Sequence, residues 1–505
     1  MSRSWDSVVL GAGKSGLTAA CLLARAGKRV LVLERRDVIG GTSSSDEFHP
    51  GYRTAGVLHD TRGVRRSLVA ALELESCGLR LAPEPPPVYA PCGEGGGILL
   101  HHDPGKAVSE IKRFSARDAE RYAAYRAFLR RIEGPVRRFL EEPPPRLFEP
   151  SLGDAIPLLR QAWGLRRLGQ ATMLEVLRVA PMCVADWLGE WFETPFLKAA
   201  LAMPAIESTF AGPWSPGTAA NLLLYECGAQ GHVVGGPSAL ARALERAARQ
   251  RGVEIRLGST IQEILVAEGR VTGVRLAGGE EIAASGIMAS CDPRHTFLDL
   301  VSSRHLTHRF EERVRSYRGY GLTAVMRLAL DGPLEFRGRE KEPIPRARIG
   351  EDLDALERAF DPAKYDALPD TPSLDVYVPS LEDPSLAPPG HHVVTIHARC
   401  VPYRLAEGWM PDGRIEVERR ILGTLFRHAP SAEARIVGAE FLSPVDLEAQ
   451  YGLVQGHLHH GDHALDQLLV RPTPECMHSR TPVGGLLLCG GGVHPGTGIV
   501  DGPGD

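Results

Sequence analysis

Apolar positions near the start of the chain follow two different periods. Residues 7–10 and residues 29–33 are short apolar runs of the length and composition of buried strands. Between them, residues 17–26 carry apolar side chains at helical spacing, and Gly27 stands where a helix C-cap belongs. The pattern predicts a strand–helix–strand unit whose two strands are parallel neighbours in one sheet.

Farther along, the pattern predicts a long helical region and then a β-rich one. Pro- and Gly-rich breaks occur at residues 83–97, 143–145 and 388–390, and the chain from 115 to 224 has mostly helical spacing. The other predicted elements are a helix at 237–252, strands at 253–257, 261–267, 270–276 and 281–289 with glycine turns between them, and a late strand at 485–489.

Composition indicates a globular protein of two or three domains. The chain has 505 residues, of which 43% are hydrophobic and 24% charged. Its 58 Lys and Arg residues against 62 Asp and Glu residues give a formal net charge of -4. This balance offers no general attraction to nucleic acid, so we expect no nucleic-acid partner.

The cysteine pattern argues against two classes of site. No two of the nine cysteines form a Cys-x-x-Cys pair, and no histidines flank them at zinc spacing. We therefore expect neither disulfide oxidoreductase chemistry nor a metal site. Because the first strand begins near Trp5 and no apolar run reaches about 18 residues, we expect no signal peptide, no membrane span and a cytoplasmic location.

A glycine fingerprint carries the strongest chemical signal. Gly11-x-Gly13-x-x-Gly16 follows the first predicted strand and opens the first predicted helix, as in dinucleotide-binding folds. Glu34 ends the second strand, where its carboxylate would accept hydrogen bonds from a ribose and would disfavour the 2′-phosphate of NADP. The chain has a single fingerprint, whereas an enzyme with paired flavin and nicotinamide domains would have two.

The segments after this unit resemble a known family. Gly40-Gly41-Thr42 follows Glu34 at the spacing typical of flavoproteins of the glutathione-reductase-like fold. Residues 235–282 and the step Ala289 to Pro293 resemble corresponding parts of the phytoene desaturases. Residues 443–474 and 481–504 closely resemble phytoene-desaturase-like (carotenoid desaturase-like) FAD-dependent oxidoreductases, so the resemblance covers the whole chain.

The resemblance implies an α/β fold: a Rossmann-like FAD-binding domain of the glutathione-reductase/amine-oxidase type with an inserted mixed α+β substrate domain. Residues 1–70, 226–300 and 480–505 would form the discontinuous FAD-binding domain. Residues 71–225 and 301–479 would form the substrate domain, which includes a helical insert.

It also implies which residues hold FAD. The pyrophosphate would lie on Gly11, Ala12, Gly13, Ser15 and Gly16, and the adenosine ribose near Glu34 and Arg35. The other implied contacts are Gly40, Gly41 and Thr42 under the phosphates and ribityl, Ile261 at the adenine, and Gly491, Gly498, Ile499 and Val500 along the phosphate, ribityl and flavin edge.

One departure from the family lies at the C-terminus. Family members continue past the Pro-Gly step into a final helix that faces the flavin C2 carbonyl, whereas this sequence ends at Asp505. A helix N-terminus stabilises negative charge on reduced flavin, so its loss predicts weaker FAD binding or a mobile tail.

The predicted function is FAD-dependent oxidation of an apolar, polyene-like or lipid-like substrate by hydride transfer to flavin N5, through desaturation, oxidation or isomerisation. The alternatives are a flavin-fold interaction protein with little turnover and an amine oxidase. We expect a substrate cavity lined mainly by aliphatic side chains; a cavity dominated by Arg and Lys would indicate an acidic substrate instead.

Histidines and the helical insert add two further expectations. His49, His232 and His494 lie in motif segments and are candidates to face the cavity, although a structural hydrogen-bonding role is expected for each. The family's membrane-docking region corresponds to the helical insert, which mixes Leu, Trp and Met with Arg. The resemblance therefore implies a peripheral membrane contact, and ordinary packing is the alternative.

Overall fold

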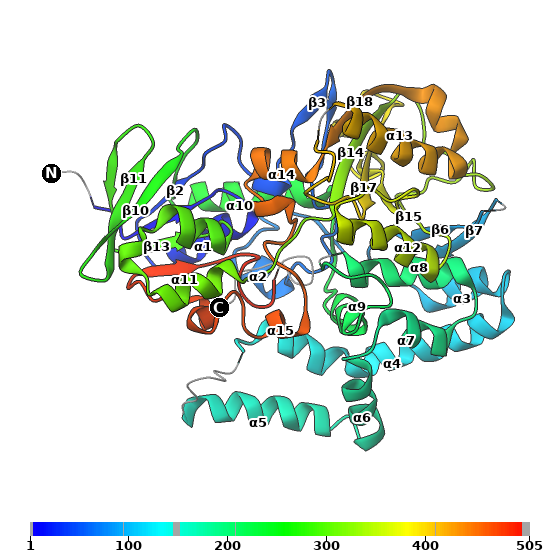
Figure 1. Cartoon of the computed structure of the whole chain (residues 1–505), viewed down its shortest axis with the longest axis horizontal. Coiled ribbons are helices and arrows are strands. Elements are labelled where there is room, and N and C mark those ends of the chain that lie inside the picture. The colour runs from blue at the N-terminus through cyan, green and yellow to red at the C-terminus, as the bar shows by residue number, and fades with distance from the viewer. Residues whose placement is uncertain (1–3, 94, 145–151, 208, 410, 497–505) are drawn as a thin grey trace.

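A five-stranded parallel sheet forms one side of the molecule in this computed structural model (Figure 1). The structure describes residues 4–93, 95–144, 152–207, 209–409 and 411–496. The strand order is β19-β13-β1-β2-β9, comprising β19 (Leu486–Leu488), β13 (Ile287–Ala289), β1 (Ser7–Leu10), β2 (Val30–Leu33) and β9 (Glu254–Arg256). With α1 (Lys14–Arg25) between β1 and β2, the predicted strand–helix–strand unit is confirmed.

Alternate residues of these strands pack on opposite faces of the sheet. Val9 of β1 packs with Leu17 of α1 and Leu244 of α10 (Gly236–Gln250), whereas Val8 faces the other way. That second face packs against α11 (His308–Arg315) and a three-stranded antiparallel sheet of β10 (Ile261–Ala267), β11 (Arg270–Leu276) and β12 (Glu281–Ala283). Both faces are buried, which accounts for the continuous apolar runs.

The single strand expected at residues 281–289 is wrong. The chain pairs with β11 as far as Ala283, turns at residues 284–286, and then enters the parallel sheet as β13. The local signal for this break is the dipeptide Ser285-Gly286, which is common in turns and stands between the two short apolar segments.

A seven-stranded mixed sheet forms the other half of the molecule, at the upper right of Figure 1. One face packs against α13 (Pro411–His428), and the other turns toward the five-stranded sheet's half. The order is β18 (Ile436–Leu442), β14 (Thr323–Leu330), β17 (His392–Arg399), β16 (Leu374–Tyr377), β15 (Arg346–Ile349), β6 (Val88–Pro91) and β7 (Gly97–Leu100). Two short ribbons pair β3 (Glu47–His49) with β4 (Tyr52–Arg53) and β5 (Leu81–Ala82) with β8 (His232–Val233).

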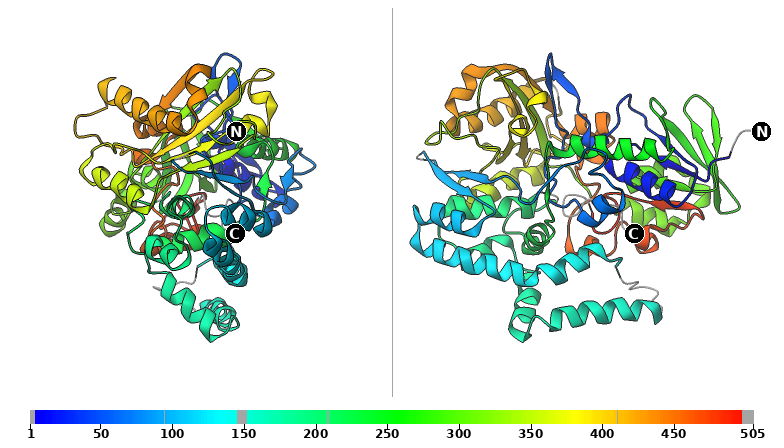
Figure 2. Two further views of the ribbon diagram at one scale, coloured as in Figure 1. Left: turned by 90° about the vertical axis from the view of Figure 1, so that its right-hand side faces the viewer. Right: turned by 180° about the vertical axis from the view of Figure 1, so that it is seen from behind.

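Helices occupy most of the chain between β7 and β8, as expected. They are α3 (Pro104–Lys112), α4 (Ala116–Glu141), α5 (Leu152–Arg166), α6 (Gln170–Val179), α7 (Val184–Trp191), α8 (Pro195–Ala202) and α9 (Thr218–Cys227). The remaining helices are α2 (Arg66–Ala71), α12 (Leu353–Phe360), α14 (Pro444–Tyr451) and α15 (Leu465–Leu468). Helix α5 extends along the lower edge of the molecule beyond α4 (Figures 1 and 2). Within the described ranges, no helix is both long and apolar enough to cross a membrane.

The parallel sheet draws its strands from three separate stretches of sequence: the N-terminal segment, residues 254–289 and residues 486–488. The proposed domain division at residues 70, 225, 300 and 479 stays a prediction. What the topology establishes is that the glycine fingerprint, the middle of the chain and its late strand meet at the carboxyl ends of one sheet. Ligands bind at that edge in open α/β folds.

Candidate functional site

The glycine fingerprint forms a tight turn between β1 and α1. A Cβ on Gly16 would lie 2.0 Å from the carbonyl oxygen of Gly11, so only glycine allows this approach of helix to strand. Helix α1 begins at Lys14, and the free N–H groups of its first turn face the end of β1. This arrangement is suited to binding a phosphate group.

A second glycine turn packs against the first. Gly40 and Gly41 both have positive φ angles, 119° and 56°. The N–H of Gly40 donates to the carbonyl of Ala12 at 2.9 Å, and Gly13 pairs with Gly40 as an isolated bridge. The two glycine turns therefore make one continuous backbone surface.

Glu34 is buried at the end of β2, with 7% of its surface exposed. Its carboxylate accepts hydrogen bonds from the N–H of Ala12 at 2.8 Å and from the N–H of Arg36 at 3.0 Å. A carboxylate has about four acceptor sites, so Glu34 retains capacity for ribose hydroxyls.

These elements border a cavity of about 390 Å³, which we call the nucleotide cavity. Its volume lies in the range of known ligand pockets, roughly 300–1,000 Å³. Nine of the residues expected to hold FAD line it: Gly11, Gly13, Ser15, Glu34, Arg35, Gly41, Thr42, Ile261 and Gly491. The residues chosen from the sequence thus come from four distant segments and meet around one space.

Six other expected residues do not line the nucleotide cavity in the structure. Ala12, Gly16 and Gly40 lie behind its wall, where they shape the two glycine turns. Gly498, Ile499 and Val500 lie outside the described residues. The assignment of these three residues stays a prediction.

The sequence reasoning missed part of the nucleotide cavity's wall. Lys14 occupies a variable position inside the glycine fingerprint, and Tyr451 to Val454 come from the end of α14 and the turn after it. Residues 443–474 carry a clear family resemblance, which was the available signal for this second group.

A small cavity of about 20 Å³ adjoins the nucleotide cavity and shares Lys14 and Leu58 with it. We call it the histidine cavity because His59, His397, His459 and His463 line it, together with Glu207. Burial is the main cause that lowers the pKa of His59, His459 and His463 well below the ordinary value, so these imidazoles are neutral. Burial raises the pKa of the Glu207 carboxyl, but Arg399 and His397 lower it by more, so this carboxylate is ionised.

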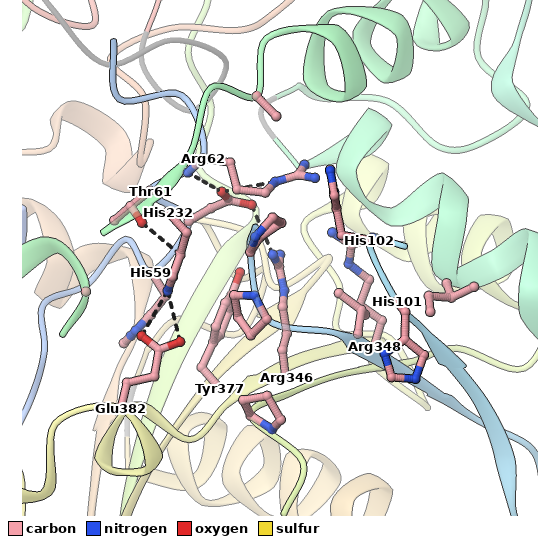
Figure 3. Close-up of a pocket in the computed structure, with 18 of the residues that line it drawn as sticks. His59, Thr61, Arg62, His101, His102, His232, Arg346, Arg348, Tyr377 and Glu382 are labelled. Carbon is pink, nitrogen blue, oxygen red and sulfur yellow. Dashed lines mark hydrogen bonds and ion pairs between the residues drawn. The ribbon is translucent and has the colours of Figure 1, made fainter. Parts of the chain in front are cut away.

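A third cavity of about 110 Å³ shares His59, Asp60 and Tyr377 with the histidine cavity (Figure 3). We call it the arginine cavity. Four arginines, four histidines and three acids line it, with apolar side chains among them. The basic residues are Arg62, Arg126, Arg346, Arg348, His59, His101, His102 and His232. The acids are Asp60, Glu226 and Glu382, and the apolar side chains include Val88, Leu100, Leu201 and Val378. Shared wall residues place the three cavities next to one another, in a series from exposed His102 to the glycine fingerprint.

Ion pairs organise the arginine cavity. Arg346 binds Asp375 at 2.7 Å and Asp60 at 3.0 Å, and Arg126 binds Glu226 at 2.8 Å. Although burial raises the pKa of the Asp60 carboxyl, Arg62 and Arg346 hold it well below its usual range. These acids are therefore ionised, as paired buried carboxylates are.

This lining contradicts the expected aliphatic cavity. The wall includes Arg346 and Arg348 of β15 and Tyr377 of β16, whose intervening neighbours pack toward α13. Asp375 lies on the same face of β16 and pairs with both arginines. A strand's alternation predicts which side chains share a face, but not that the polar face is buried. His59, Asp60 and Arg62 were also missed, although they follow the Gly40-Gly41 turn within one short polar segment.

The histidines singled out from sequence have different environments. His232 lines the arginine cavity and contacts Thr61 and Glu382 at 3.1 and 2.9 Å, whereas both ring nitrogens of His494 contact backbone carbonyls. His49 packs beside Tyr52 at the β3–β4 ribbon.

Over the described ranges, no three His, Cys, Asp or Glu side chains are placed to hold a metal ion together. All nine cysteines are free thiols, and burial raises the pKa of Cys291 to about 11.

The residues around the nucleotide cavity fit a dinucleotide cofactor. Gly11 and Gly13 leave a cradle that a Cβ would occupy, the start of α1 offers free N–H groups, and Glu34 places a carboxylate at the ribose position. Lys14 and Leu58 border both cavities, so a bound cofactor would lie beside the histidine cavity.

Comparison with known proteins agrees with this site. A family model described as flavin containing amine oxidoreductase matches residues 15–502. The chain is 32% identical to pyridine nucleotide-disulfide oxidoreductase domain-containing protein 2 of Rattus norvegicus, over 99% of this chain and 92% of that protein. It is 26% identical to a lycopene-forming phytoene desaturase of Pseudescherichia vulneris, over 98% and 96% of the two chains.

Solved structures share the fold. An oxidoreductase from Methanosarcina mazei gives a TM-score of 0.58 at 16% identity, covering 96% of this chain and 94% of that one. A triple variant of putrescine oxidase gives the same TM-score and identity, covering 96% and 93%. The predicted fold class and the resemblance to the desaturases are confirmed.

Proposed function

The chain belongs to the flavin containing amine oxidoreductase family and is an FAD-dependent oxidoreductase, and on this premise we propose that it oxidises an amphipathic small molecule that enters through the arginine cavity. The observation that carries the proposal is the series of three cavities. The arginine and histidine cavities share His59, Asp60 and Tyr377 in their walls. The histidine cavity and the nucleotide cavity share Lys14 and Leu58. Polar groups and aliphatic side chains both line the entrance, so the proposed substrate has a polar end and an apolar body.

When bound, FAD supplies the two-electron chemistry by accepting a hydride from a substrate carbon. The protein itself would supply a group that accepts the proton released from the substrate. His59 is a neutral imidazole stacked on Tyr377, with ring centroids 4.7 Å apart. Its Nε2 is buried and has no hydrogen-bond partner within the described chain. We assign His59 the role of receiving the proton that leaves with the hydride.

Anaerobic bleaching of the flavin absorbance tests this function. A panel of carboxylic acids, alcohols, amines and polyenes of matched chain length should contain compounds that bleach the flavin, and those compounds should be amphipathic. His59→Asn should slow bleaching by about a hundredfold or more without changing FAD content. His308→Asn changes an exposed histidine on α11 and serves as the control. Bleaching by His59→Asn at the wild-type rate would refute the assigned role.

A second candidate is desaturation of a wholly apolar substrate taken from a membrane, as the resemblance to phytoene desaturases suggests. The supporting observation is the apolar surface of α5 and α6, where Ile156, Leu159, Trp163 and Leu177 are 58–69% exposed. Exposed Arg166 and Arg167 lie close by in sequence, so the surface suits an anionic membrane. Bleaching by a polyene in vesicles, and by no water-soluble acid, would favour this candidate.

A further inference from the structure

We infer that Arg62 binds a carboxylate group of the substrate, so that the substrate is an organic acid with an apolar chain. The inference rests on the proposed function, in which the arginine cavity is the substrate's entrance. Arg62 lies in the wall of that cavity, and its guanidinium points across it in Figure 3.

Two donor nitrogens of the Arg62 guanidinium lack a hydrogen-bond acceptor among the described residues. Its Nε and Nη2 atoms are buried, and neither donates a hydrogen bond to any described residue. Nε lies 3.4 Å from Asp60 Oδ1, an ion pair without hydrogen-bond geometry. The central carbon of the guanidinium lies over the ring of Tyr225, 3.7 Å from the ring centroid. The guanidinium is therefore held in one orientation while an edge of it lacks an acceptor.

The neighbouring acids are already satisfied by other donors. Asp375 receives two hydrogen bonds from Arg346, at 3.0 and 2.7 Å. Asp60 Oδ2 accepts from Arg346 at 3.0 Å and from the hydroxyl of Tyr225 at 2.7 Å.

Three guanidinium groups share two carboxylates beside Arg62. Arg62, Arg346 and Arg348 lie around Asp60 and Asp375. Glu226 lies in the same wall and pairs with Arg126. A carboxylate bound at Arg62 would supply the acceptor that its buried Nε and Nη2 atoms lack.

The geometry favours a carboxylate among monoanions. A planar guanidinium with a free edge matches the two oxygens of a carboxylate. A volume of about 110 Å³ has room for a head group and a few carbons. Val88, Leu100 and Leu201 line the same space, so an aliphatic chain would contact apolar side chains. His59 and Tyr377 lie in the wall between this cavity and the histidine cavity, so a chain that passes them would point toward the nucleotide cavity.

Calorimetric titration of the FAD-loaded protein with hexanoate tests the inference, because binding is measured without turnover. Hexanoate should bind one site per chain, and hexanamide, which has the same shape without the charge, should bind at least about tenfold more weakly. Arg62→Gln should weaken hexanoate binding by at least about tenfold, Arg62→Lys should weaken it less, and Arg130→Gln on exposed α4 surface should not change it.

The outcomes separate this inference from the proposed function. Equal affinity for hexanoate and hexanamide in the wild-type protein, or no hexanoate binding, would overturn the carboxylate site whether or not any variant folds. Wild-type affinity in Arg62→Gln, at normal FAD content, would overturn the role of Arg62. Hexanoate binding that depends on Arg62, together with a flavin that no organic compound bleaches, would leave this site standing and refute the oxidation instead.

Discussion

The carboxylate of Glu34 accepts a hydrogen bond from the backbone N–H of Ala12, with 2.8 Å between Oε2 and N. This contact links the end of β2 to the glycine turn after β1 across 22 residues of sequence. Glu34 therefore fixes the shape of the glycine turn and also lies in the wall of the nucleotide cavity.

The first prediction concerns this turn. Glu34→Lys removes the acceptor for Ala12, and Gly16→Ala places a Cβ 2.0 Å from the Gly11 carbonyl oxygen. Each variant should bind FAD at least about tenfold more weakly. Glu34→Lys loses a charge-assisted hydrogen bond, which contributes roughly 1.5–3 kcal/mol, and Gly16→Ala forces the start of α1 away from the glycine turn. The ratio of flavin to protein absorbance and a fluorescence titration with FAD measure the change.

The matched control is Gly134→Ala in the middle of α4, where an added Cβ meets no atom within 4 Å. It should retain wild-type FAD content. Full flavin occupancy in both Glu34→Lys and Gly16→Ala would show that the turn does not hold the cofactor.

The second prediction concerns Arg471, which is 1% exposed and donates to four backbone carbonyls. One carbonyl belongs to Gly491 in the wall of the FAD site, and the others belong to His459, Gly461 and Asp462. A lysine has no planar fork and cannot satisfy this set. Arg471→Lys should lower both the thermal midpoint and FAD affinity, whereas Arg318→Lys, at an exposed pair with Asp466, should change neither. Unchanged FAD affinity in Arg471→Lys would show that the hydrogen bonds of Arg471 do not support cofactor binding.

The third prediction is a pH dependence of stability. Burial raises the pKa of the Asp375 carboxyl, but Arg346 and Arg348 lower it by more. Since the unfolded pKa is about 3.9, these pairs stabilise the fold fully above about pH 4 and lose their effect as pH falls through the folded pKa. Asp375→Asn should cost about 3–5 kcal/mol at pH 7 and flatten the decline in stability below pH 4.

Urea unfolding at pH 7, 4, 3 and 2.5 measures this effect. Asp370→Asn, at a fully exposed carboxylate 3.4 Å from Arg420, is the control and should leave the unfolding midpoint unchanged. A decline between pH 4 and 2.5 that is equally steep in Asp375→Asn and wild type would assign the acid sensitivity to other groups.

The fourth prediction concerns the apolar surface of α5 and α6. If this surface contacts membranes, Leu159→Asp with Trp163→Asp should reduce co-sedimentation with anionic phospholipid vesicles several-fold, because apolar area provides the contact. Ile415→Asp changes a similarly exposed apolar side chain on α13 and should bind as the wild type does. No binding of the wild-type protein to such vesicles would remove the membrane contact and favour a soluble substrate.

Much of the FAD site could be predicted from the sequence because its geometry is local. The turn between β1 and α1 depends on glycines a few residues apart, and Glu34 follows from the length of one strand–helix–strand unit. Ile261 and Gly491 came from the resemblance instead, since nothing in their local spacing indicates that they meet Gly11 around one cavity.

The seven-stranded sheet shows where prediction from the sequence stops. Alternation in β15, β16 and β17 assigns Arg346, Asp375 and His397 to one face and their apolar neighbours to the other. Read alone, that pattern indicates a sheet with one face in water. The structure buries the polar face instead, with Arg346 5% and Asp375 1% exposed, because the segment after the second glycine turn and helix α9 cover it.

The sequence by itself therefore determined the shape of the phosphate-binding turn through short-range spacing, and the family and the cofactor through the resemblance of its segments to known flavoproteins. The tertiary structure decided which polar side chains enclose the arginine cavity. Asp60 and Arg346 lie 286 residues apart along the chain, and Arg346 and Asp375 lie 29 residues apart, so no local rule brings these three side chains together. A buried charge is stable only beside its partner, so the folded contacts alone determine where the charged cavity lies.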